Sequence, residues 1–147
     1  MDIDVKELKE KHVGFEFDQS RFEIVPEKLV AYAEACGETE PRFIDPADPD
    51  FRAVPNYPAS FHGQKNLPDG FPLSRRRSFD GGKMVESFAA IRSGDVITGR
   101  SHIHEIYEKT GRSGPMMFVV HRMEFSNQKD EPVAIVDWRL VVRLGEM

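Results

Sequence analysis

The second half of the chain carries four apolar or alternating runs separated by short turns, and this pattern constrains the fold more than any other feature. The runs cover residues 83–91, 95–108, 116–126 and 132–144. The separators, such as Arg92-Ser93-Gly94, consist of residues that favour turns. Because short connections place successive strands side by side in opposite directions, the pattern predicts a four-strand antiparallel meander.

The last run predicts which face of its strand is buried. One face carries Val133, Ile135, Asp137, Arg139, Val141 and Arg143. The other carries Ala134, Val136, Trp138, Leu140, Val142 and Leu144, and it is the predicted core face.

The first half is mixed. Residues 13–25 are typical of a strand, and residues 27–36 have one apolar stripe at helical spacing, with Pro26 suited to the first turn and Gly37 to the C-terminal cap. Seven of the ten prolines fall between Pro41 and Pro72, which excludes a long helix there. Interleaved aromatic residues predict a long ordered loop, with a short helix over residues 59–66. The whole is an α+β domain.

Length and composition place the chain among folded proteins of one domain. It has 147 residues, 39% apolar and 31% charged, and the first 12 could be a flexible end. The net charge of −5 provides no basic surface for nucleic acid, and no apolar run is long enough to span a membrane. The single cysteine, Cys36, excludes an internal disulfide and a cysteine metal cluster, so we expect a cytoplasmic protein.

Several strings, taken in order, resemble one family. They are residues 31–41 (AYAEACGETEP), 58–61 (PASF), Gly81-Gly82 with Glu86, 92–97 (RSGDVI), and 107–120, which contain a Gly-Arg-Ser-Gly-Pro turn. Together they resemble the MaoC-like dehydratases, and more closely the N-terminal dehydratase domains of the fatty-acid-synthase type. The resemblance implies a hot-dog fold, in which a curved antiparallel sheet wraps around a central helix and leaves a slot for an acyl chain.

The resemblance also implies an activity. Such enzymes add water to a 2-enoyl thioester, or remove it from a 3-hydroxyacyl thioester, carried by coenzyme A or acyl carrier protein. A carboxylate and an imidazole transfer the protons, and both must lie within hydrogen-bond reach of the substrate. The resemblance implies no cofactor apart from the carrier, and it implies a homodimer or a heterodimer with a paralogous hot-dog subunit.

The family supplies its catalytic pair from a Gly-Asp-x-Asn-Pro-x-His pattern after the first helix. Here Glu38 stands at the Asp position, Glu40 at the Asn position and Phe43 at the His position. Phe43 cannot transfer a proton. The candidate catalytic residues are therefore Glu38 and His62, the one histidine near the expected start of the central helix.

Other residues are candidates for substrate binding. Arg76, in a run of three arginines, could meet the phosphates of coenzyme A or an acidic carrier. The resemblance implies further contacts from Glu40, Phe43, Phe61, Gly63 and Gly82. His102 and His104 share a strand face, but no third ligand accompanies them, so no metal site is predicted.

Three functions follow from these residues. The first is a lyase subunit that supplies acyl-binding walls while a partner supplies Asp and His. The second is a non-catalytic acyl-thioester-binding module or structural dimer. The third is a hot-dog thioesterase that uses Glu38 as base or nucleophile, which no matching motif supports.

Overall fold

All the strands predicted for the second half of the chain form in the computed structural model, which describes residues 3–73 and 76–145. One strand from the first half joins them. The strands are β1 (Glu16–Glu23), β2 (Ser78–Ser87), β3 (Val96–Gly111), β4 (Gly114–Ser126) and β5 (Pro132–Arg143). The first strand of the predicted meander, β2, begins at Ser78 instead of Lys83 and ends at Ser87 instead of Ile91.

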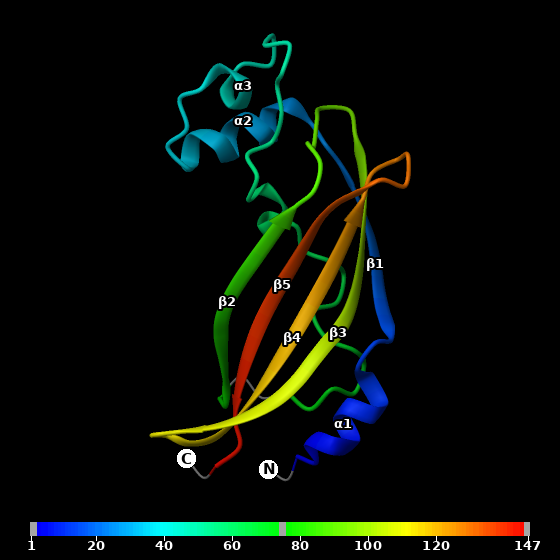
Figure 1. Ribbon diagram of the computed structural model, residues 1–147, viewed down its shortest axis with the longest axis vertical. Helices are drawn as coiled ribbons and strands as arrows, with labels where there is room; N and C mark the ends of the chain where they lie inside the picture. Colours follow the sequence, from blue (N-terminus) through cyan, green and yellow to red (C-terminus); the bar gives the residue numbers. More distant parts are fainter. Residues whose placement is uncertain (1–2, 74–75, 146–147) are drawn as a thin grey trace.

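The five strands pair antiparallel in the order β1-β3-β4-β5-β2 (Figure 1). The predicted meander is right for β3, β4 and β5 but wrong for β2, which pairs with β5 at the far edge. Because β2 ends early, residues 88–95 cross the end of the sheet, where Ala53 donates its N–H to the carbonyl of Ile91 over 2.8 Å. The turn before β3 bonds to the end of β1 instead, since Gly94 donates to Ile24 over 2.9 Å.

The helices lie on one side of the sheet and at its ends. They are α1 (Val5–His12), α2 (Pro26–Ala35), α3 (Pro41–Ile44) and the 3₁₀ helix η1 (Tyr57–Ser60). Helix α2 matches the prediction, with Pro26 in its first turn and Gly37 at a φ of 80°, which a glycine adopts without strain. Residues 5–12, thought from the sequence to be a possible flexible end, form α1.

The short helix predicted over residues 59–66 does not form. The chain makes only η1 there, and residues 61–73 pass behind the sheet without helical structure (Figure 1). Leu67 and Phe71 from this segment pack against the inner face of the sheet. Apolar side chains of an irregular loop therefore cover the sheet where a central helix was expected, because Pro68 and Pro72 do not permit a continuous helix.

Two apolar clusters cover the inner face, one under α2 and α3 and the other toward α1. The predicted core face of β5 carries buried Ala134, Val136, Leu140 and Val142, but Val133 and Val141 of the opposite face are buried as well. The opposite face is not simply exposed. It contains buried Asp137, held by Arg122 of β4 through two hydrogen bonds of 2.7 and 2.9 Å. No helix within residues 3–73 and 76–145 is long and apolar enough to cross a membrane.

Candidate functional site

The loop that would carry the catalytic pair joins α2 to α3. Cys36 caps α2, and the N–H of Glu38 donates to the carbonyl of Ala33 over 3.0 Å, which fixes the turn. Pro41 then opens α3, which is only one turn long, and Phe43 lies within it. Phe43 is 6% exposed and packs in the core cluster under α2. The residue at the histidine position is thus part of the core and lines none of the described pockets.

The two carboxylates of this loop differ in their surroundings. Glu38 is half-buried, and its carboxylate has no hydrogen-bond or ion-pair partner among the described residues. Glu40 is exposed and forms an ion pair with Arg42, with 2.8 Å between Oε2 and Nε. A solvated pair of this kind contributes little to stability. Neither carboxylate is held in a position suited to proton transfer.

His62 lies elsewhere, just after η1. Its side chain is exposed and lines two hollows: a small one against the inner face of the sheet, of about 20 Å³, and a larger one beside α2, of about 470 Å³. Glu38 lines neither of them. The structure therefore does not bring the two predicted catalytic residues together.

The neighbours of His62 have structural roles. Phe61 is buried and stacks on Phe22 of β1, with 4.5 Å between ring centroids. At Gly63 a Cβ atom would clash with Oδ2 of Asp18. That carboxylate oxygen accepts the backbone N–H of Gln64 over 2.9 Å, so glycine allows the loop to approach β1 closely.

Gly82 and Arg76 lie near the outer edge of the sheet. Gly82 has a φ of 97° in the irregular part of β2 and donates its N–H to Asp80 over 2.7 Å, so it shapes the strand. Arg76 is exposed, and its neighbour in the arginine run, Arg75, lies outside the described residues. Neither residue lines a described pocket.

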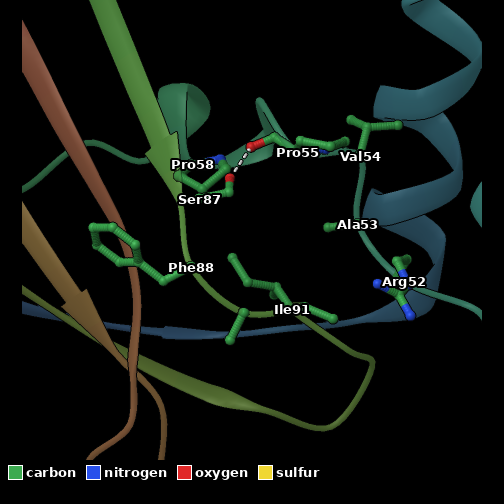
Figure 2. A pocket seen from close by; sticks show the side chains of 10 residues that line it. Arg52, Ala53, Val54, Pro55, Pro58, Ser87, Phe88 and Ile91 are labelled. Atoms are coloured by element: carbon green, nitrogen blue, oxygen red, sulfur yellow. Dashed lines mark hydrogen bonds between the residues drawn. The ribbon is translucent and has the colours of Figure 1, made fainter.

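Sequence reasoning missed an apolar pocket of about 230 Å³ at the end of β2, here called the edge pocket (Figure 2). Two chain segments form its walls, residues 52–58 and residues 87–91. Its lining residues are Arg52, Ala53, Val54, Pro55, Pro58, Ser87, Phe88, Ala89, Ala90 and Ile91. The sequence predicted that β2 continues to Ile91. In a continuous strand, residues 88–91 would belong to the sheet, so no pocket was expected at this position.

Specific contacts hold the two walls of the edge pocket together. Ser87 donates from Oγ to the carbonyl of Pro55 over 2.7 Å, and Ala53 donates its backbone N–H to the carbonyl of Ile91 over 2.8 Å. Phe88 is 50% exposed and stands at the side away from Arg52 (Figure 2). The lining contains no carboxylate and no imidazole. The edge pocket can hold an apolar chain, but its own side chains include no ordinary acid or base for proton transfer.

His121, on the inner face of β4, is the most perturbed histidine. It is 4% exposed, and neither ring nitrogen has a hydrogen-bond partner among the described residues. Burial lowers the pKa of its imidazole to about 4, so it is neutral at physiological pH. On the outer face, His102 and His104 lie with ring nitrogens 3.4 Å apart, and the described residues contain no cluster of three metal-binding side chains.

The comparisons with known proteins identify the family. The family model for the FAS1-like, dehydratase domain region matches residues 11–136. The chain belongs to this FAS1-like dehydratase family. No curated protein sequence matches the chain.

Solved structures of two MaoC-like dehydratases and of a 3R-hydroxyacyl-ACP dehydratase complex share its fold. The dehydratase of Rhodospirillum rubrum is 21% identical, with a TM-score of 0.64 over 95% of this chain and 98% of that one. The dehydratase of Phytophthora capsici is 23% identical, with a TM-score of 0.70 over 99% of this chain but 51% of that one. A chain of the HadBC 3R-hydroxyacyl-ACP dehydratase complex of Mycobacterium tuberculosis is 17% identical, with a TM-score of 0.65. The match covers 96% of this chain and 99% of that one. The hot-dog fold inferred from the sequence is confirmed.

Proposed function

We propose that this chain is the acyl-binding subunit of a hydratase or dehydratase that acts on 2-enoyl or 3-hydroxyacyl thioesters. A paralogous hot-dog subunit would supply the Asp and His that transfer protons. The observation that carries the proposal is Phe43, a buried phenyl ring at the position where the family places its histidine. Membership of a dehydratase family supports the reaction class.

The edge pocket is the proposed acyl site. Its walls are apolar, and burial of apolar chain carbons there would be favourable by about 0.8 kcal/mol for each CH₂ group. The alternative slot, between the sheet and the segment that covers it, is largely filled, since the hollow at His121 holds only about 20 Å³. The thioester end would then lie toward Phe88, at the open edge of the sheet.

The proposed partner pairs with β2. This strand is an open sheet edge with exposed Phe79 and Met84, and Phe88 follows directly after it. Open edges with exposed apolar side chains favour association with another strand. Two of the solved structures that share this fold are heteromeric complexes, ChsH1-ChsH2 and HadBC. A partner on β2 would place its own side chains beside the edge pocket.

In the proposed reaction the partner's base removes the α-proton of a 3-hydroxyacyl thioester. Its acid delivers a proton to the leaving hydroxyl group, so that the C–O bond breaks and water departs. The acyl chain remains in the edge pocket throughout, held by the two walls that Ser87 joins. The carrier, coenzyme A or acyl carrier protein, is part of the substrate, and no other cofactor is proposed.

The experiment measures hydration of crotonyl-CoA by the purified chain, alone and with a hot-dog partner that carries an intact Gly-Asp-x-Asn-Pro-x-His pattern. We expect almost no turnover by the chain alone and restored turnover with the partner. Turnover by the chain alone that disappears in Glu38→Ala or His62→Ala would contradict the proposal, because it would assign a catalytic pair to this chain.

Two further outcomes identify the alternatives. Acyl-thioester binding with no turnover beside any such partner would favour a binding module over a lyase subunit. Release of free thiol from acyl-CoA by the chain alone would favour a thioesterase. Either result would overturn the proposed subunit role.

A further inference from the structure

The larger of the two hollows that His62 lines has polar walls and plays no part in the proposed acyl site. We call it the α2 pocket. It lies between β1, the start of α2 and η1, and has a volume of about 470 Å³. Phe22 and Phe61, stacked on each other, form its apolar side. Polar and charged side chains form the remainder.

Two cations and an imidazole surround the α2 pocket. Arg21 from β1, Lys28 from α2 and His62 all line it, and none of the three forms an ion pair within residues 3–73 and 76–145. One carboxylate, Glu23, also lines it. The local charge is therefore positive, on a chain whose net charge is −5. This local excess of positive charge favours an anion.

Tyr57 adds a neutral donor to the same pocket. Its side chain is 6% exposed, and its hydroxyl has no hydrogen-bond partner among the described residues. Edge-on contacts with Tyr32 and Phe61, at 5.1 and 5.3 Å between centroids, fix the ring. Burial raises the pKa of the Tyr57 hydroxyl, so it keeps its proton at neutral pH and can donate it. The hydroxyl oxygen is not one of the buried atoms that lack a partner, so it reaches the open part of the pocket and can donate a hydrogen bond to a ligand oxygen there.

The start of α2 provides further donors. Val25, its N-cap residue, lines the pocket and gives no side-chain cap, and Pro26 has no N–H. The backbone N–H groups of Glu27 and Lys28 belong to the first turn, whose donors have no partner within the helix. The positive end of the helix dipole favours an anion at this point.

We propose that the α2 pocket binds the phosphate group of a phosphate-bearing small molecule. Residues that carry guanidinium, ammonium and hydroxyl donors line the pocket from β1, α2 and η1, and this spread suits the several acceptor oxygens of a tetrahedral phosphate better than a planar carboxylate. The site is independent of the proposed acyl function, because it uses none of the residues that line the edge pocket.

The test is calorimetric titration of the full chain with inorganic phosphate, AMP and adenosine. We expect phosphate and AMP to bind and adenosine not to bind. Lys28→Met should weaken AMP binding about tenfold, and Tyr57→Phe, which removes only the hydroxyl, about fivefold. Lys9→Met is the matched control, because Lys9 lies on α1 at the opposite end of the molecule (Figure 1).

The titrations also distinguish the source of the phosphate. AMP that binds much more tightly than phosphate would indicate a nucleoside phosphate, whereas equal affinities would indicate that the phosphate group alone is recognised. Absence of phosphate and AMP binding would overturn the proposal. Binding that is unchanged in Lys28→Met and in Tyr57→Phe would also overturn it, provided that both variants unfold at the temperature of the wild-type chain.

Discussion

Ser87 donates a hydrogen bond from its hydroxyl to the backbone carbonyl oxygen of Pro55, over 2.7 Å, and this bond joins the two walls of the edge pocket (Figure 2). One wall is the end of the edge strand β2, and the other is the proline-rich loop that returns from α3. The pocket thus depends on contact between segments 32 residues apart in the sequence.

Loss of this bond should loosen the pocket. We expect Ser87→Ala to lower the free energy of unfolding by about 1 kcal/mol, the usual net value of one hydrogen bond. Binding of hexanoyl-pantetheine, an acyl thioester without phosphate, should weaken as well. Ser20→Ala, which removes a hydroxyl 3.4 Å from Asp18 on β1, should leave that binding unchanged. Equal thioester binding by wild type and Ser87→Ala, in a calorimetric titration, would contradict the assignment of the acyl site.

Phe43 should contribute to stability and not to turnover. Because its ring is 6% exposed in the core, Phe43→Ala should cost about 3 kcal/mol in urea unfolding. Phe15→Ala is the control, since Phe15 is 63% exposed and its truncation should change stability by less than about 0.5 kcal/mol. We expect Phe43→His to lose stability, because it buries an imidazole, and to gain no hydratase activity. Hydration of crotonyl-CoA by Phe43→His alone would show that this position still faces a substrate.

His121 should make stability depend on pH. Its pKa is about 4 when folded, and an unfolded histidine has a pKa of about 6.5. The unfolded state therefore binds the proton first as the pH falls. The contribution is complete above pH 6.5 or so, and up to about 3 kcal/mol is lost as the pH falls toward 4.

The matched variant is His121→Phe, which keeps a ring in the core and cannot titrate. We expect its free energy of unfolding to fall less steeply than that of wild type between about pH 6.5 and pH 4. It should also be as stable as wild type or more so at pH 7, since both ring nitrogens of His121 lack partners. Parallel stability curves for the two proteins, from urea unfolding at each pH, would contradict the buried neutral state.

The edge of β2 should control association. We expect the double variant Met84→Lys and Phe88→Lys to lose association with the proposed hot-dog partner, because charge on an edge strand opposes strand pairing. Phe15→Lys, at another exposed apolar site, which follows α1, should leave the mass of the complex unchanged. Light scattering after gel filtration measures the mass of the complex for the double variant and for Phe15→Lys. A complex that persists in the double variant would place the interface elsewhere.

Local patterns in the sequence predicted much of the fold. The alternation of residues 132–144 predicted the core face of β5, because side chains on a strand alternate between its faces. Pro26 and Gly37 predicted both ends of α2, since each residue has a backbone preference of its own. The histidine position occupied by Phe43 also needed no structure to be recognised as unable to transfer protons.

Contacts between distant segments decided the rest. The sequence placed β2 beside β3, but residues 88–95 cross the end of the sheet and β2 pairs with β5. This pairing joins segments separated by 46 or more residues, and no local pattern specifies it. Glu38 and His62 lie in loops, whose relative position no periodicity specifies, and the structure keeps them apart. The edge pocket and the α2 pocket exist only because η1 and its flanking loop pack against both edges of the sheet. Sequence alone determined that the second half of the chain forms four strands and that Phe43 cannot transfer a proton, whereas long-range packing determined where a ligand can lie.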